Sequence, residues 1–250
     1  MKLTVVGHWG AYPEAGEATS GYLVEHNGFK LLVDCGSGVL SQLQHYCKLE
    51  ELNAVIISHY HHDHIADVGP LQYSMDIGRA LKKVTQPLPI YGHGLDQEEF
   101  GRLAKPPNTV AYMYSEKETT KIGPFSISFM RTNHKAICFA MRIEVDGEVL
   151  VYSADSSYKE EFNEFAKNAD VFICETNFYA GQDGKPFGHM NSHDAASIAK
   201  AANVKTLLLT HLPHFGNTAD LVEEAKSIFS GKVLLAEKGL TIGGESLHKM

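Results

Sequence analysis

The sequence predicts an α/β (α+β) protein built from two mixed β-sheets that pack together, with helices on their outer faces. Short apolar runs typical of strands recur in both halves of the chain, and each half also contains segments with a helical pattern. Strong hairpin turns stand at Asn27-Gly28 and Asp146-Gly147, because these residue pairs tolerate positive φ. Two packed sheets covered by helices is one arrangement that buries the apolar faces of all these elements.

The first half of the chain carries strand patterns that give way to helical ones. Residues 3–7 and 20–26 have the composition of strands, and residues 29–33 form the return strand after the turn at Asn27-Gly28. Further along, we expect a helix at 38–47, a strand at 53–58, a helix at 68–83 and a strand at 88–91.

The second half begins after a loop marked by Pro106-Pro107-Asn108. Strands are expected at 109–114, 119–122, 125–132, 137–145, 148–153, 170–175, 204–210, 232–236 and 239–242. Helices are expected at 158–168, 192–202 and 219–230. Because no linker, low-complexity segment or close repeat separates the halves, we expect a single domain over residues 1–250.

The composition is that of an ordinary globular protein, with 44% hydrophobic and 21% charged residues in a chain of 250. The formal net charge of −8 opposes binding of long RNA or DNA, which depends on Lys and Arg contacts to phosphate. The four Cys form no Cys-x-x-Cys pair, and no apolar run approaches the length of a membrane span. The N-terminus lacks the apolar region of a signal peptide, so we expect a cytoplasmic protein without disulfides or a membrane partner.

The strongest chemical signal is the segment Ser58-His59-Tyr60-His61-His62-Asp63-His64, which follows an apolar strand pattern. On a tight turn His59 and His61 can point to one side, while Asp63 and His64 face a second position. Imidazole and carboxylate groups suit Zn²⁺, with Mn²⁺ or Fe as alternatives. The competing explanation is chance clustering, but the residue types, their order and their spacing all fit a metal site.

One segment cannot close two metal sites, so further ligands must come from later in the chain. Three candidates follow predicted strands: His134 after 125–132, Asp155 after 148–153 and His211 after 204–210. One edge of a sheet could gather all three of them. The competing explanation is that each is an ordinary polar residue at a strand end.

The pattern His-x-His-x-Asp-His, followed at a distance by His, Asp and His, resembles the metallo-β-lactamase fold superfamily over nearly the whole chain. The resemblance implies a four-layer αββα sandwich and two Zn²⁺ ions per chain. By the same resemblance, one ion is held by His59, His61 and His134 and the other by Asp63, His64 and His211, with Asp155 bridging both.

Two later segments are similar to the tRNA 3′-processing ribonucleases of this superfamily, the ribonuclease Z branch. Glu175-Thr176-Asn177-Phe178 resembles their Glu-x-Thr-Phe region, and Gly188-His189-Met190-Asn191 resembles part of their Gly-His-Ser-Thr-Ala segment. The resemblance implies that His189 is a catalytic proton donor paired with Glu175. It also implies that Asp34, in Val33-Asp34-Cys35-Gly36, supports the metal loop. Without the resemblance, His189 would be a residue at a helix N-terminus, Glu175 a surface carboxylate and Asp34 the cap of a turn.

The sequence departs from the processing ribonucleases in two places. Those enzymes carry a long arm that grips tRNA between the equivalents of His134 and Asp155, whereas here only residues 135–154 lie between the two, with a tight hairpin. Glu17 stands about where the family has an Arg ahead of the residue equivalent to Ser20. Together with the net charge of −8, these departures argue against long tRNA as a partner.

The expected chemistry is hydrolysis by a metal-bound hydroxide. Two metal ions can share one water and lower its pKa to about 7. Asp63 would position this nucleophile or accept its proton. His189, kept protonated by Glu175, would stabilise the charged group or protonate the leaving oxygen. This layout predicts a phosphodiesterase or ribonuclease-like enzyme whose substrate is a small phosphodiester or a short nucleic acid, such as a cyclic nucleotide, a modified nucleotide or an RNA end.

Several alternatives stay open at this point. The substrate could be a thioester, a lactone or a sulfate ester. The flavodiiron oxygen-reductase branch of the fold expects a carboxylate in place of His61 and a fused flavin domain, so this sequence argues against that branch. A metal-binding protein without catalysis is a remote alternative, against which the full ligand set and His189 argue. Because relatives by fold often dimerise, we also expect a homodimer.

Overall fold

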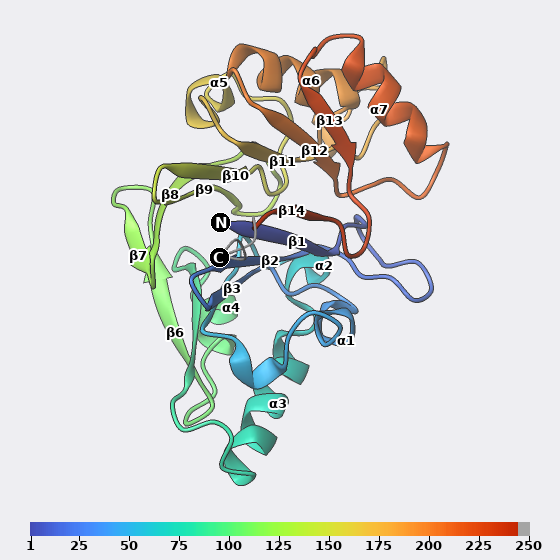
Figure 1. Cartoon of the computed structure of the whole chain (residues 1–250). Coiled ribbons are helices and arrows are strands. Elements are labelled where there is room, and N and C mark those ends of the chain that lie inside the picture. The colour runs from blue at the N-terminus through green and yellow to red at the C-terminus, as the bar shows by residue number, and fades with distance from the viewer. Residues whose placement is uncertain (245–250) are drawn as a thin grey trace, which may run out of the picture.

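In the computed structural model, which describes residues 1–244, two seven-stranded sheets pack face to face and helices cover both outer faces (Figure 1). The strand order in the first sheet is β14 (Thr241–Gly243), β1 (Lys2–Gly7), β2 (Gly21–His26), β3 (Phe29–Val33), β4 (Ala54–Ile56), β5 (Leu88–His93) and β6 (Thr109–Tyr114). The order in the second is β13 (Lys232–Leu235), β12 (Thr206–Thr210), β11 (Val171–Glu175), β10 (Glu148–Tyr152), β9 (Phe139–Val145), β8 (Phe125–Arg131) and β7 (Thr120–Ile122). This is the αββα sandwich that the resemblance implied, so the predicted fold is confirmed.

The helices fall into two layers, one beside each sheet (Figure 1). The layer beside the first sheet contains α1 (Val39–Leu43), α2 (His62–Ile65), α3 (Val68–Ala80) and α4 (Gln97–Arg102). The layer beside the second contains α5 (Phe162–Phe165), α6 (Ser192–Ala201) and α7 (Thr218–Lys226). Two short 3₁₀ helices, η1 (Leu49–Glu51) and η2 (Lys185–Phe187), complete the described chain. No helix within residues 1–244 has both the length and the apolarity needed to cross a membrane.

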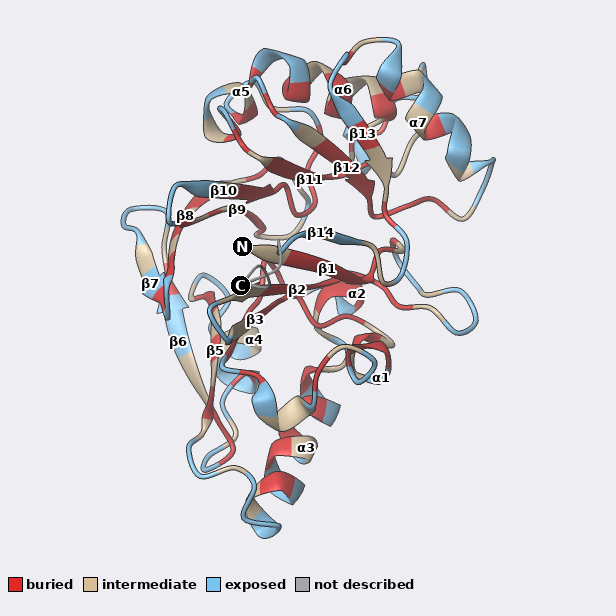
Figure 2. Cartoon of the chain, viewed as in Figure 1, coloured by how far each residue is buried: buried red, intermediate tan, exposed pale blue. Residues whose placement is uncertain are grey.

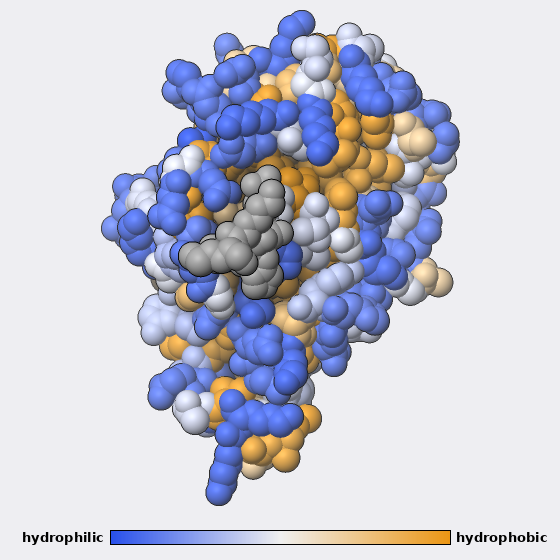
Figure 3. All heavy atoms as spheres, viewed as in Figure 1, coloured by the Kyte–Doolittle hydropathy of each residue, from blue (hydrophilic) through white to orange (hydrophobic). Residues whose placement is uncertain are grey.

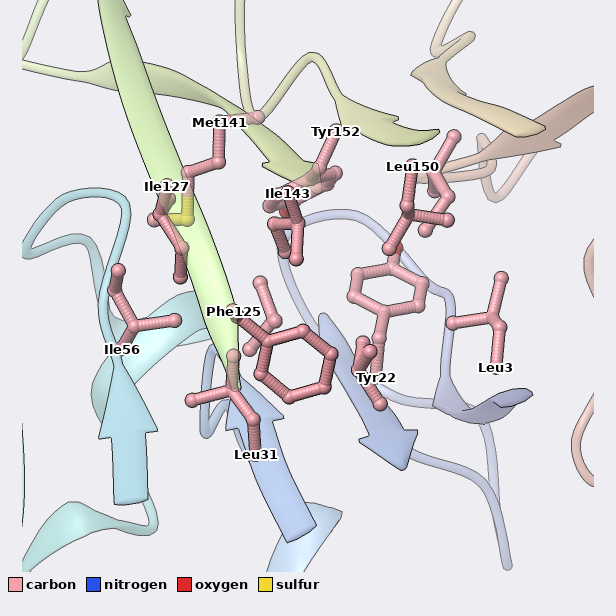
Figure 4. Packing of buried hydrophobic residues seen from close by; sticks show 14 of the residues in the cluster. Leu3, Tyr22, Leu31, Ile56, Phe125, Ile127, Met141, Ile143, Leu150 and Tyr152 are labelled. Atoms are coloured by element: carbon pink, nitrogen blue, oxygen red, sulfur yellow. The ribbon is translucent and has the colours of Figure 1, made fainter. Parts of the chain in front are cut away.

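Three buried hydrophobic clusters correspond to the three interfaces between the four layers, and most of the strand residues are buried (Figure 2). The cluster between the sheets contains Tyr22 from the first sheet and Phe125 and Tyr152 from the second (Figure 4). All three side chains are almost completely shielded from solvent. Hydrophilic residues make up most of the face shown in Figure 3. This distribution follows from the hydrophobic effect, which removes one face of each helix and both faces of each central strand from water.

Parallel pairing determines where the polar residues at strand ends lie. β3, β4, β5 and β6 are successive parallel neighbours in the first sheet, and β10, β11, β12 and β13 are parallel neighbours in the second. Parallel neighbours have their carboxyl ends at the same edge of a sheet, and ligands of α/β proteins commonly bind there. Residues that directly follow these strands therefore meet at one edge of the sandwich.

The structure corrects several predicted elements. The helix expected at 158–168 is reduced to Phe162–Phe165, because the N–H groups of Phe162 and Asn163 bond to carbonyls only three residues back and form a tighter turn. The helix expected at 38–47 is reduced to Val39–Leu43 for the same reason, since the next N–H groups also bond three residues back. The short helices α2 and α4 lie where no helix was expected, and they place the metal motif partly on a helix instead of wholly on a loop.

The segment between His134 and Asp155 is filled by β9, β10 and the turn between them. Asp146 and Gly147 have φ of 49° and 81°, which is the left-handed backbone that a two-residue hairpin requires. This segment therefore contains no long arm, in agreement with the sequence.

Candidate metal centre

The two halves of the predicted ligand set meet at the edge where the parallel strands end. His59 follows β4, Asp155 follows β10 and His211 follows β12 directly, while His134 follows the antiparallel strand β8. His61 is the residue before α2, so this helix directs Asp63 and His64 toward the same edge.

Three groups of side chains each place one potential ligand atom per residue within 4.8 Å of the others. The first contains His59, His61, His134 and Asp155, the second contains Asp63, His64, Asp155 and His211, and these two are the ligand groups referred to below. The third contains Glu175, His189 and His211. Asp155 belongs to both ligand groups, as a bridging ligand would. Every residue that the sequence suggested as a ligand therefore lies in one or both groups.

The shortest distances in each group join atoms that point at a common position. His134 Nε2 lies 3.1 Å from His61 Nδ1, and His211 Nε2 lies 3.1 Å from Asp63 Oδ2. Asp155 lies between the groups, with Oδ1 3.3 Å from the imidazole of His64 and Oδ2 3.4 Å from that of His211. Histidine and carboxylate ligands of this number suit Zn²⁺ and related divalent ions.

Buried polar atoms that lack a hydrogen-bond partner show whether these residues fit a metal ion. His59 Nε2, His64 Nε2 and Asp155 Oδ1 are buried and make no hydrogen bond within residues 1–244. A buried polar atom left unpaired costs about 1–3 kcal/mol, so three of them in one cluster require a compensating partner. A bound cation would satisfy all three, and the donor set therefore fits a metal centre.

Asp34 holds the candidate ligands from behind. Its fully buried carboxylate accepts hydrogen bonds from Ser58 N at 2.7 Å, Ser58 Oγ at 2.8 Å, His64 Nδ1 at 2.7 Å and Tyr152 Oη at 2.9 Å. The bond from His64 Nδ1 leaves its Nε2 free to face the metal position. Ser58 Oγ also lies 3.0 Å from His59 Nδ1, so Asp34 orients His59 indirectly.

The charges of the cluster shift the pKa values of its members when no metal is bound. Burial alone would lower the pKa of His64, but the carboxylates of Asp155, Asp63 and Asp34 raise it well above its ordinary value. Burial would raise the pKa of Asp63, but His64 and the hydrogen bond from His211 outweigh burial and lower it. The metal-free cluster therefore carries ionised carboxylates and a protonated His64 near neutral pH.

Glu175 and His189 form an ion pair beside both ligand groups. Glu175 is completely buried, so it is not a surface carboxylate, and its Oε1 lies 2.8 Å from His189 Nδ1. Its oxygens also accept the N–H groups of Ser156 and Met190, at 2.9 and 3.1 Å. Burial lowers the pKa of His189, but the charge and hydrogen bond of Glu175 outweigh burial and raise it to about 9.

The ring of His189 lies next to one candidate ligand from each group. Its centroid is 5.3 Å from that of His134 and 5.2 Å from that of His211. His189 therefore faces the region between the two metal positions, where a reacting group would be held.

A loop near the N-terminus, within residues 10–16, contributes further contacts to the centre. Ala11 N donates a hydrogen bond to Asp63 Oδ2 at 2.9 Å. Gly10 comes so close to the centre that a Cβ there would lie 2.7 Å from Asn177 Nδ2 and 2.9 Å from His211 Cε1. His214 Nε2 lies 3.0 Å from Gly10 O and 2.8 Å from Tyr12 O, and these bonds fix the loop. The Gly and Pro residues of this loop are the sequence signal for such a close approach.

A cavity of about 210 Å³ opens over the candidate ligands. Phe187 and Lys135 stand at its wall, and the Phe187 side chain is 54% exposed. The Lys135 ammonium lies 5.7 Å from the centre of the Phe187 ring. The wall of the cavity therefore combines a cation, an exposed aromatic ring and the protonated His189.

Comparison with known proteins places this geometry in a family. Residues 30–212 match the β-lactamase superfamily domain. The chain is 50% identical to the probable metallo-hydrolase YhfI of Bacillus subtilis over 98% of its own length and 100% of that protein. The crystal structure of YhfI superposes with a TM-score of 0.96 at 51% identity, covering 97% of this chain and 99% of YhfI.

Proteins named ribonuclease Z and tRNase Z are also similar. Ribonuclease Z of Clostridium kluyveri is 27% identical, with 94% of this chain and 95% of that enzyme covered. The human short-form tRNase Z has the same fold, with a TM-score of 0.78 at 22% identity and coverage of 97% and 99%. The matched domain, the αββα sandwich and the near-complete coverage by YhfI lead to one conclusion: the chain belongs to the β-lactamase superfamily of metallo-β-lactamase fold proteins.

Proposed function

We propose that the protein is a dinuclear zinc-dependent hydrolase that cleaves a small or short phosphodiester. The observation that carries the proposal is the position of His189, which is bonded to the buried Glu175 and lies beside both ligand groups. A phosphodiester carries a negative charge that grows on its oxygens during cleavage, and a protonated imidazole at this position can offset that charge.

The residues of the proposed centre have distinct tasks. His59, His61 and His134 would hold one ion, Asp63, His64 and His211 would hold the other, and Asp155 would bridge them. When bound, two such ions supply a nucleophile at neutral pH and offset negative charge on the substrate. Zn²⁺ is our first choice because histidines predominate, while Mn²⁺ and Fe remain alternatives.

The chain's own acid and base groups would move the protons. Asp63 is held by Ala11 N, which fixes one carboxylate oxygen and leaves the other to orient the attacking water or accept its proton. His189 uses Nδ1 to bond Glu175, so its Nε2–H is free to hold a phosphoryl oxygen or to protonate the leaving oxygen. Glu175 keeps the imidazole charged because it stabilises the protonated form.

The names of related proteins support phosphoester chemistry. Curated relatives include ribonuclease Z, and one structure of the same fold is a diphosphatase of the PhnP family with a TM-score of 0.76. Long tRNA is not our proposed substrate, because the net charge is −8 and the hairpin at residues 135–154 leaves no arm to grip it. We place the enzyme in the cytoplasm, since all four Cys are buried and unpaired, as in reducing compartments.

The test compares ester classes with the zinc-loaded protein. We expect turnover of bis(p-nitrophenyl) phosphate to exceed that of a lactone, a thioester and a sulfate ester. Replacing His189 with Ala should leave two ions per chain but lower kcat for the phosphodiester about 100-fold or more, because a general acid contributes at least that factor. His45→Ala is the matched control, since His45 is an exposed histidine of the loop that follows α1.

Two results would contradict the proposal. Robust turnover of another ester without cleavage of the phosphodiester would show that the substrate is not a phosphodiester. An unchanged kcat in His189→Ala would remove the proton-donor role.

A further inference from the structure

A second cavity, of about 420 Å³, adjoins the metal centre. It shares His61 and Lys135 with the smaller cavity over the candidate ligands, so the two spaces meet at these side chains. Its volume lies in the range typical of small-molecule sites. Its other walls include Tyr60, His93, Asp96, Glu99, Arg102 and Ile137.

His93 is a buried polar group at the wall of this second cavity. It ends β5, the parallel neighbour of the strand that leads into the metal motif. Its side chain is 1% exposed, and its imidazole bonds only the backbone of Ile137, which leaves one ring nitrogen without a partner within the described residues. Tyr60 fixes this segment, because its hydroxyl donates to His93 O at 2.6 Å and its ring lies 4.4 Å from the imidazole.

The imidazole of His93 is neutral near pH 7, since burial lowers its pKa to about 4. A neutral imidazole offers one N–H donor and one acceptor nitrogen. Because buried polar groups are normally hydrogen-bonded and the N–H faces the backbone of Ile137, the remaining acceptor nitrogen at the cavity wall indicates a ligand that donates a hydrogen bond.

The charged residues of the second cavity balance one another. The guanidinium of Arg102 is already bonded to Glu98 at 2.7 Å and to Glu99 at 2.5 Å. Asp96 accepts the N–H of Glu99 through Oδ1 at 3.1 Å, and its Oδ2 makes no hydrogen bond within residues 1–244. An additional anion would find no unpaired cation beyond Lys135 among the lining residues, whereas a hydroxyl group could donate to Asp96.

The geometry points to a subsite for an uncharged, hydroxyl-bearing group of the substrate, such as a sugar or a glycerol unit, bound by His93 and Asp96. This inference rests on the proposed phosphodiester hydrolysis. His189 lines the smaller cavity and serves the leaving oxygen, while the second cavity opens beyond His61. The hydroxyl-bearing substituent of the phosphodiester therefore stays bonded to phosphorus after cleavage. Lys135 lies where the two cavities meet, where it would be beside the phosphoryl group.

A pair of substrates that differ only in two hydroxyls tests the subsite. The zinc-loaded protein is given 2,3-dihydroxypropyl p-nitrophenyl phosphate or propyl p-nitrophenyl phosphate, which share their leaving group and carbon skeleton. We expect kcat/KM to be at least 10-fold higher for the dihydroxypropyl ester, since a hydrogen bond to a charged group discriminates by about that factor. Equal kcat/KM values, or a preference for the propyl ester, would overturn the inference.

Two variants locate the effect. Asp96→Asn keeps the cap of α4, because Asn caps helices as well as Asp, but it should remove most of the 10-fold preference. His93→Phe keeps the volume and should remove the preference as well. The control Glu98→Gln changes an exposed carboxylate of the same helix, and it should leave the preference intact. A preference that survives in Asp96→Asn would overturn the inference even if His93→Phe does not fold.

Binding separates failure of the subsite from failure of the proposed function. Calorimetry with glycerol 1-phosphate and propyl phosphate reports recognition of the hydroxyls without turnover. Tighter binding of glycerol 1-phosphate that depends on Asp96, with no cleavage of either diester, would support the subsite and refute the phosphodiesterase. Cleavage of both diesters at equal rates would support the phosphodiesterase and refute the subsite.

Discussion

Replacing Asp34 with Asn should weaken metal binding although residue 34 touches no metal position. Asp34 has a φ of 58°, which Asn also adopts readily, so the backbone should remain in place. The carboxylate accepts four hydrogen bonds, three of them at Oδ2 from Ser58 Oγ, His64 Nδ1 and Tyr152 Oη. An amide has only one oxygen, so in either orientation its NH₂ group faces at least one donor.

The expected magnitude follows from the loss of support for His64. Removing the partner that orients a metal-bound histidine typically lowers metal affinity about 10- to 100-fold. This corresponds to about 1.4–2.8 kcal/mol. The loss should fall on the position formed by Asp63, His64 and His211, because Asp34 bonds His64 directly and reaches His59 only through Ser58.

Competition between the protein and a chromophoric zinc chelator measures both affinities. We expect one weakened site and one nearly unchanged site in Asp34→Asn. Asp67→Asn is the matched control, because Asp67 accepts a backbone N–H from Leu40 and is not part of the ligand groups. Wild-type affinity at both sites of Asp34→Asn would refute the reasoning.

Three further predictions concern protons and packing. At pH 7 zinc binding should release at least one proton, because the pKa of His64 is raised and its proton must leave before the metal binds. The heat of zinc binding should therefore differ between buffers of different ionisation enthalpy, and equal heats would contradict the prediction. Burial lowers the pKa of His8 from 6.5 to about 4, so only the unfolded chain binds this proton between those values. The free energy of unfolding of the metal-free protein should therefore fall, by up to about 3 kcal/mol, as the pH drops from 6.5 to 4. Chemical denaturation at several pH values should show that this free energy depends less on pH in His8→Gln. Phe125→Ala should cost about 3–5 kcal/mol of stability, because Phe125 is fully buried between the sheets, and an unchanged denaturation midpoint would contradict that packing (Figure 4).

The sequence by itself determined the local features of the site. The turn at Asp146-Gly147 and the apolar runs of the strands depend on neighbouring residues only, and the structure has them close to the predicted bounds. The spacing of His59, His61, Asp63 and His64 likewise acts within one short segment, and the structure places these residues in two neighbouring groups. Short helices were least predictable, because a turn such as α5 is decided by a few hydrogen bonds and not by a periodic pattern.

Only the tertiary structure decided which distant groups support the site. Tyr152 reaches Asp34 from the opposite sheet, Ala11 N bonds Asp63, and the fold buries Glu175 completely. None of these contacts has a recognisable sequence motif, since almost every residue has a backbone N–H and a tyrosine in a strand is common in any hydrophobic core. The cavity beside His93 also joins residues distant in sequence, since β5 ends at its wall and residues 135–137 come from the other half of the chain. Local residue chemistry specifies which atoms can bind a metal, whereas long-range strand pairing decides which groups lie close enough to orient them.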